Sequence, residues 1–174
     1  MVPSIRRLLA GNGADRVRVG LIVDGPNVLR DEFDVDLDDV RKAARSLGVL
    51  SVRRVYLDER APPGLIQATE ARGFEVIVTS GDVDVRLAID ATALVATDAL
   101  DVLAVASRDT DFKPLFEYAA ENGTETVVLS PGAHGRSDAL INAAQRVIHL
   151  DEVTPSADTD RDPVTDAVSD HTSK

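Results

Sequence analysis

Aspartate residues follow three stretches of this sequence that are predicted to be buried strands. Asp24 comes directly after the apolar run GLIV, and Asp109 and Asp111 lie in the segment SRDTDF that follows VLAVA. The segment GDVD, which contains Asp84, comes shortly after the β-branched run EVIV. In an open parallel sheet, ligands bind beyond the carboxyl ends of the strands, so these side chains are expected to share one edge. Asp24, Asp109 and Asp111 form the tightest group.

Carboxylates brought together in this way repel one another, and raised pKa values or a bound cation relieve the repulsion. The chain has no cysteine and only three histidines, so oxygen ligands predominate, and these select Mg²⁺ or Mn²⁺ rather than zinc. The alternative is structural: Asp109 or Asp111 caps the helix predicted to start at Phe112. Asp24 is harder to explain as a cap, because it stands where a fully buried strand ends.

A predicted helix over residues 85–96 adds two further acids, Asp84 at its start and Asp90 within it. Asp90 is flanked by Ile89 and Ala91 in a nearly continuous apolar helix, where a carboxylate is costly to bury unless it is solvated or paired. Six positions separate the two aspartates, which puts them about 120° apart around an ideal helix. Both are therefore expected to serve one site only if Asp84 precedes the first helical turn.

The elements that position these residues alternate regularly between strands and helices. Strands are predicted at 16–23, 50–57, 74–78, 102–106 and 126–129, with an edge strand at 146–150, and helices at 37–47, 62–72, 85–96, 112–121 and 137–144. Strands that alternate with helices of about ten residues require right-handed crossovers. The predicted fold class is therefore α/β: a doubly wound, mainly parallel sheet of five to six strands with helices on both faces.

This domain is predicted to span residues 16–150. Residues 1–15 are expected to form an N-terminal extension with a short helix at 4–10. Residues 151–174 are rich in Asp, Ser, Thr and Pro and have almost nothing to bury, which predicts a disordered acidic tail.

The charge of the chain is strongly negative and has a particular composition. Its formal net charge is −11, with 22 Asp against 8 Glu and 16 Arg against 3 Lys. An excess of Asp with few Lys is typical of proteins kept soluble in very high salt, where repulsion is screened within about 3 Å at 1 M. A nonspecific basic face for nucleic acid is not expected. The tail, however, carries seven acids and two bases, so about −5 of the charge lies outside the predicted domain.

Several function classes lose support from features that the sequence lacks. No apolar run reaches the roughly 18 residues that span a bilayer, and the first ten residues are too weakly apolar for a signal peptide, so a cytoplasmic protein with no membrane partner is expected. Aromatic residues make up only 3%, which disfavours a base-stacking platform. The sequence has no P-loop motif, no GxGxxG and no nucleophile elbow, which argues against P-loop hydrolases, dinucleotide enzymes and serine hydrolases.

Three segments in this order resemble the NYN domain family, a group of PIN-like, LabA-like ribonucleases. The segments are VDGPN, GDVDVRLAIDA and SRDTDFKPL, and the resemblance covers about residues 17–150. It implies a doubly wound sheet of PIN type and the cleavage of an RNA partner with Mg²⁺ or Mn²⁺ as cofactor. The acid-rich composition points to a haloarchaeal-type member.

By position, the resemblance also implies roles for individual residues. Asp24 and Asp109 are the expected direct metal ligands, and Asp84 and Asp111 are expected to complete the coordination. Asn27 is similar to the family's motif asparagine and is expected to position a water or a phosphate oxygen. The implied reaction is endonucleolytic hydrolysis of RNA by a metal-activated water, with no side chain as nucleophile.

The same resemblance extends to residues around the metal ligands. Asp90 is, with Asp84, one of the two helix acids and is expected to take part in catalysis. Arg86, Ser107 and Arg136 are the expected substrate-binding residues. Ser107 is also similar to the small residue that supports the turn of the DxD segment.

The alternative function is a catalytically weak or inactive protein of the same fold that regulates by binding RNA or a partner. Family members often carry Lys just before the GDVD-type segment, where this chain has Thr79-Ser80, and Gly at the position of Arg108. Toprim domains share the DxD spacing of Asp109 and Asp111, but they require a catalytic Glu after the first strand. A homodimer is compatible with this kind of domain.

Overall fold

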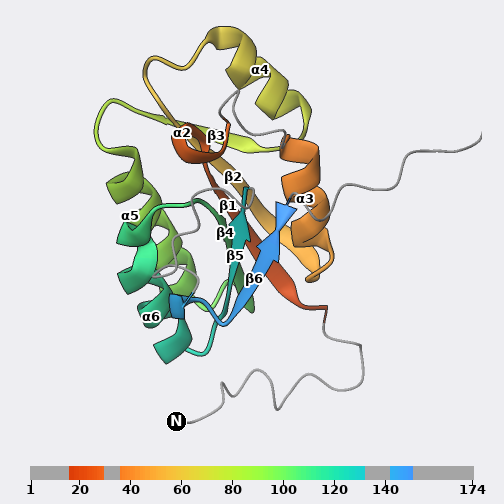
Figure 1. The fold of residues 1–174 in the computed structure, drawn as a ribbon, viewed down its shortest axis with the longest axis vertical. Helices are drawn as coiled ribbons and strands as arrows, with labels where there is room; N and C mark the ends of the chain where they lie inside the picture. The colour runs from red at the N-terminus through yellow and green to blue at the C-terminus, as the bar shows by residue number, and fades with distance from the viewer. Residues whose placement is uncertain (1–15, 30–35, 132–141, 151–174) are drawn as a thin grey trace, which may run out of the picture.

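The computed structural model describes residues 16–29, 36–131 and 142–150 (Figure 1). Three sequence predictions lie outside these residues: the short helix at 4–10, the disordered tail at 151–174, and Arg136 as a substrate-binding residue. The helix predicted at 137–144 lies mostly outside them as well, and its described residues Asn142 and Ala143 are helical.

Six strands form one sheet in the order β3-β2-β1-β4-β5-β6, and every pair of neighbouring strands is parallel (Figure 1). The strands are β1 Arg18–Asp24, β2 Val49–Asp58, β3 Glu75–Thr79, β4 Val102–Ala106, β5 Glu125–Ser130 and β6 Arg146–His149. The predicted class, a doubly wound α/β sheet of five to six mainly parallel strands, is confirmed.

Helices cover both faces of this sheet (Figure 1). The helices are α2 Gly25–Val28, α3 Leu37–Arg45, α4 Pro63–Ala71, α5 Val83–Ala96 and α6 Lys113–Glu121, and a 3₁₀ turn, η1 Thr110–Phe112, precedes α6. Side chains of α2, α3 and α4 pack on one face, and those of α5 and α6 pack on the other. Within the described ranges, no helix is long and apolar enough to cross a membrane.

Two apolar clusters, one on each face, join the helices to the sheet. Along β1, Leu21 and Val23 belong to the cluster that includes α3, whereas Ile22 between them belongs to the cluster that includes α5 and α6. All of β4 is buried. The two central strands are therefore covered on both faces, which their continuous apolar runs predict.

Most element boundaries lie within two residues of the sequence prediction, and three of the differences have a local cause. Helix α5 starts at Val83, two residues early, because Asp82 caps it. The short helix α2 occupies a segment expected to be a loop, since Asp24 caps it and Pro26 stands in its first turn. The turn η1 comes before α6, so that α6 begins one residue later than expected.

The order of the strands reverses between β1 and β4. From β1 the chain passes through α3 to β2 on one side, and from β4 it passes through α6 to β5 on the other. In open α/β sheets, ligands bind beyond the carboxyl ends of the strands at such a switch point. Asp24, the last residue of β1, and the segment that follows β4 both lie there.

Candidate metal centre

Asp24 is fully buried, and both of its carboxylate oxygens accept hydrogen bonds. Oδ2 accepts from Nδ2 of Asn27 at 2.6 Å and from Oγ of Ser107 at 2.7 Å. Oδ1 accepts from the backbone N–H of Asn27 at 3.3 Å, which makes Asp24 the N-cap of α2. A buried carboxylate is costly unless it is paired, and here three neutral donors provide the pairing. They also fix the orientation of the carboxylate.

The sequence DGPN allows this arrangement because two of its residues suit a tight exit from β1. A Cβ at Gly25 would lie 2.6 Å from the backbone oxygen of Tyr56 on the neighbouring strand β2, so the position has no room for a larger side chain. Pro26 stands in the first turn of α2, where a backbone N–H is not needed. The turn brings the Asn27 side chain back to Asp24.

The electrostatic state of Asp24 reflects opposing effects. Burial raises its pKa above the usual range for an aspartate, and the negative charge of Asp109 adds to the rise. The hydrogen bonds from Asn27 and Ser107 lower the pKa, because they stabilise the ionised form. Positive charge at this position would therefore favour the ionised carboxylate further.

Ser107 connects Asp24 to the segment that follows β4. Its buried hydroxyl donates to Asp24 and accepts from the backbone N–H of Asp109 at 3.0 Å. Asp109 accepts from the backbone N–H of Asp111 at 2.9 Å and thereby caps η1. Asp109 thus caps η1, whereas the helix α6, which the sequence predicted it to cap, has no side-chain cap. Asp109 also lies close enough to Asp24 to raise the pKa of that residue. Ser107, expected to bind substrate, has its hydroxyl shared between two protein partners.

Asp84 lies in the first turn of α5 and shares this edge of the sheet. Burial raises the pKa of Asp84 to about 6, with further contributions from the negative charges of Asp24, Asp109, Asp82 and Asp111. Such repulsion requires that the carboxylates lie near one another. The charges of Asp24, Asp109 and Asp111 therefore act on Asp84 at the same edge of the sheet, and their role as metal ligands stays a prediction.

Asp90 is paired with residues other than the four carboxylates. Its Oδ2 accepts from the hydroxyl of Tyr56 at 3.1 Å and from Nε of Arg86 at 3.0 Å. Because Asp84 stands within the first helical turn rather than before it, the two helix acids diverge by about 120°. Asp90 is thus separated from the other carboxylates and paired with Arg86, one of the expected substrate-binding residues.

The donor set of Asp24, Asp84, Asp109 and Asp111 fits a hard divalent cation. All four side chains offer carboxylate oxygens, the ligands that Mg²⁺ and Mn²⁺ prefer, and an ion would relieve their repulsion. Among the residues that the structure describes, no three Asp, Glu or His side chains already stand close enough together to hold an ion. Ion binding would therefore draw these carboxylates closer to one another.

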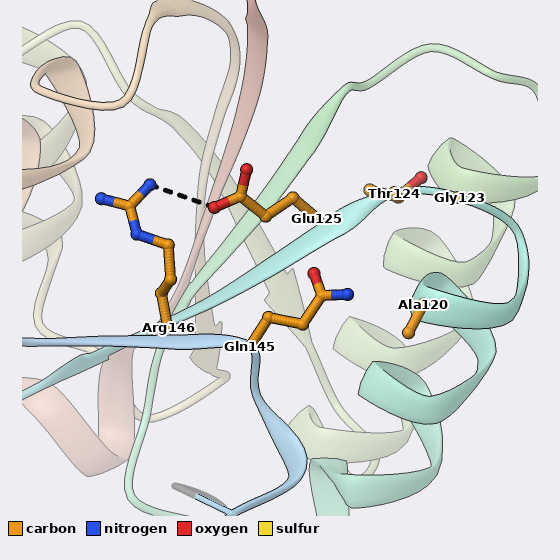
Figure 2. Close-up of a pocket in the computed structure, with 6 residues that line it drawn as sticks. All are labelled: Ala120, Gly123, Thr124, Glu125, Gln145 and Arg146. Carbon is orange, nitrogen blue, oxygen red and sulfur yellow. Dashed lines mark hydrogen bonds and ion pairs between the residues drawn. The ribbon is translucent and has the colours of Figure 1, made fainter.

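Two surface hollows lie at the opposite edge of the sheet, toward the amino ends of the strands. One, of about 410 Å³, is lined by the end of α6 and the starts of β5 and β6, and an ion pair at 3.0 Å joins Glu125 to Arg146 within it (Figure 2). The other, of about 540 Å³, lies over the early part of β2 and the start of β3. Neither hollow is lined by a predicted site residue. The candidate site is therefore identified by its cluster of carboxylates and not by a pocket in the surface.

Two residues that shape the site were not identified from the sequence. Asp82 caps α5, and its charge contributes to the raised pKa of Asp84. Its position in the GDVD segment, two residues before Asp84, is the sequence feature that could have indicated this role. Tyr56 gave no such signal, because it lies in an ordinary strand pattern 34 positions before its partner Asp90.

Known proteins include relatives of this chain in sequence. A family model of the NYN domain matches residues 18–151. An uncharacterized protein of Methanocaldococcus jannaschii is 43% identical over 136 residues, a match that covers 78% of this chain and 56% of the relative. The chain thus spans about half the length of that curated relative.

A solved structure also has a similar fold. It is a protein of unknown function from Vibrio parahaemolyticus, similar with a TM-score of 0.69 and 20% sequence identity over 81% of this chain and 97% of that one. At this level of identity, the likeness shows the fold alone.

Proposed function

Because the chain belongs to the NYN domain family, whose members are usually nucleases, we propose that it is a divalent-metal-dependent ribonuclease. The proposed reaction is hydrolysis of RNA phosphodiester bonds by water. One observation carries the proposal: Asp24, buried at the switch point of the sheet, is fixed by neutral donors amid the negative charges of Asp84 and Asp109.

Four carboxylates are the proposed ligands of Mg²⁺ or Mn²⁺. Asp24 and Asp109 would hold the ion directly, and Asp84 and Asp111 would complete its coordination. When bound, the ion supplies the positive charge that activates a water and stabilises the leaving oxygen. Asp111 is exposed, and Asp84 and Asp109 are partly exposed, so an RNA strand can approach this edge from the side. The proposed cut is made within the strand.

Polar residues around the carboxylates have supporting roles in this proposal. Asn27 and Ser107 hold the Asp24 carboxylate in one orientation, and such partners of a ligand tune its affinity for an ion. Arg86 donates from Nε to Asp90, and the other N–H groups of its guanidinium are proposed to contact an RNA phosphate. Arg136, in the segment outside the described residues, is proposed to contact the RNA backbone as well.

The test is an RNA cleavage assay with end-labelled single-stranded and structured RNAs, in Mg²⁺, Mn²⁺ or EDTA. We expect internal cuts that require the metal and disappear in EDTA. Asp109→Asn is expected to lower the rate at least about 100-fold without a loss of folded protein. Metal-independent cleavage, or full activity of Asp109→Asn, contradicts the proposal.

The second candidate function is a catalytically inactive protein of this fold that binds RNA or a partner. It is favoured by the spacing of the acids, since no three ligand side chains among the described residues are already within reach of one ion. Calorimetry with Mn²⁺ separates the two functions, because absence of binding at millimolar metal favours the regulator. A homodimer and a cytoplasmic location stay predictions from the sequence.

A further inference from the structure

Tyr56 joins β2 to α5 beside the candidate site. It pairs with Asp24 in the register of β1 and β2, and it is fully buried. Its hydroxyl donates to Oδ2 of Asp90 at 3.1 Å, and the same oxygen accepts from Nε of Arg86 at 3.0 Å. Asp90 is therefore held both from the sheet and from its own helix.

The same network continues to the edge strand of the sheet. Arg54 stands two residues before Tyr56 on β2, where its positive charge opposes the rise that burial causes in the pKa of the tyrosine, and it donates from Nε to Glu75 of β3 at 2.7 Å. Tyr56 is thus held in place by its burial in the core. Its hydroxyl offers α5 a stationary anchor.

Apolar burial alone does not fix the rotation of α5. Leu87, Ala91 and Val95 are buried against the sheet, but Val85 and Ile89 on another side of the helix are also apolar and are 55% and 60% exposed. Turning the helix would exchange one apolar face for another, at small cost in buried area. A polar contact at one position is a means of selecting a single arrangement among several apolar ones.

The rotation of α5 decides where Asp84 points. On an ideal helix, Asp84 lies within about 20° of Ala91 and Val95, the residues that face the sheet. Asp90 lies about 120° from Asp84, on the side nearest Tyr56. Anchoring Asp90 therefore also fixes the direction of Asp84.

We propose that Tyr56 and Asp90 are positioning residues, whose hydrogen bond sets the rotation of α5 so that Asp84 faces Asp24 and Asp109. This role rests on the proposed function, since it treats Asp84 as a metal ligand. It assigns Asp90 to the support of the site and not to contact with the ion or the RNA.

The first measurement is Mn²⁺ affinity by calorimetry. Tyr56→Phe and Asp90→Ala each remove the hydrogen bond, and we expect both to weaken Mn²⁺ binding about 10-fold. The double variant is expected to bind no more weakly than Asp90→Ala alone, because Asp90→Ala already removes the hydrogen bond that Tyr56→Phe removes. Asp90→Asn retains an oxygen acceptor for the tyrosine hydroxyl and is expected to recover most of the affinity.

The second measurement requires no metal. Amide hydrogen exchange in the first turns of α5, at Arg86 and Leu87, is expected to be about 10-fold faster in Tyr56→Phe and Asp90→Ala than in the wild type. Tyr118→Phe is the matched control, because it removes the hydroxyl of the other tyrosine, which packs against the same core cluster. We expect it to leave both measurements unchanged.

Either of two results overturns the proposal: unchanged Mn²⁺ affinity and exchange in Tyr56→Phe, or losses in Tyr118→Phe equal to those in Tyr56→Phe. Failure of the proposed function has a different signature, in which the wild type itself binds no Mn²⁺. In that case, the exchange comparison still decides whether the bond between Tyr56 and Asp90 fixes α5.

Discussion

At the residue scale, the carboxylates of the site differ in how strongly their surroundings favour the ionised or the neutral form. Burial raises the pKa of Asp24, and the hydrogen bonds from Asn27 and Ser107 offset part of that rise. Asp84 has a pKa of about 6, because burial and like charges favour its neutral form. A divalent ion must displace the proton of Asp84, so metal affinity is expected to rise with pH around that value.

Replacing Ser107 tests the support of Asp24. Ser107→Ala removes a donor to a buried carboxylate and an acceptor for the Asp109 amide, so we expect a loss of about 1–3 kcal/mol in the free energy of unfolding. Mn²⁺ affinity is expected to fall about 10–100-fold. Urea denaturation and calorimetry measure the two effects. Ser130→Ala, at a buried serine that ends the neighbouring strand β5, is the control, and an equal loss of metal affinity there would refute the assignment.

The raised pKa of Asp84 predicts a pH dependence of stability in the metal-free protein. Its pKa rises from 3.8 to about 6, so the folded state holds the proton more tightly than the unfolded state. The resulting stabilisation is present below pH of about 4 and is lost as the pH rises through about 6. Asp84→Asn should therefore stabilise the metal-free protein at pH 7 by about 1 kcal/mol, after allowance for solvent screening, and less at pH 5.

Urea denaturation of wild type and Asp84→Asn in EDTA at the two pH values gives the comparison. A variant that is less stable than the wild type at neutral pH would show that Asp84 is not repelled by its neighbours.

At the scale of elements, the spacing of hydrophobic residues and the positions of Gly, Pro and capping residues predicted the strands and most helices to within about two residues. The continuous apolar runs of β1 and β4 give the strongest signal, because central strands of a parallel sheet are buried on both faces. Local sequence did not reveal that Asp90 bonds to Tyr56, since that contact depends on how α5 packs against β2. It also missed the early start of α5, which the cap at Asp82 decides.

The exit from β1 gives a prediction at this scale. Gly25→Ala would bring a Cβ to 2.6 Å from the backbone oxygen of Tyr56, so β1 or β2 must shift, and we expect a loss of about 1–3 kcal/mol in the free energy of unfolding. Gly64→Ala in α4 is the matched control: no atom lies within 4 Å of its added Cβ, and it should stabilise by up to about 1 kcal/mol. Thermal denaturation compares them, and an unaffected Gly25→Ala contradicts the close approach.

At the scale of the whole molecule, charge and function are connected through the position of the acids. Residues 1–150 hold 23 acids and 17 bases, a formal −6, and Asp24, Asp84, Asp90, Asp109 and Asp111 are among those acids. The composition indicated that acids exceed bases but not that four of them share one edge of the sheet. That fact depends on the strand order, which sets β1 beside β4 although about 80 residues separate them in the sequence.

The excess of acids predicts a dependence on salt. Screening of repulsion among carboxylates in about 1 M KCl is expected to raise the thermal midpoint of the protein above its value at low salt. The experiment is done in EDTA, so that binding of divalent ions does not contribute. A midpoint that falls with salt, or does not change, contradicts adaptation of this chain to saline conditions.

The central claim is that Asp24 belongs to a metal centre that cleaves RNA. The most direct measurement is the rate of Mn²⁺-dependent cleavage of one end-labelled RNA by wild type, Asp24→Asn and Asp58→Asn. Asp58 is the matched control, because it ends the adjacent strand β2 and its carboxylate accepts from the backbone N–H of Arg60. We predict that Asp24→Asn lowers the rate at least about 100-fold while Asp58→Asn cleaves like the wild type. Cleavage by Asp24→Asn at the wild-type rate, or equal losses in both variants, would contradict it.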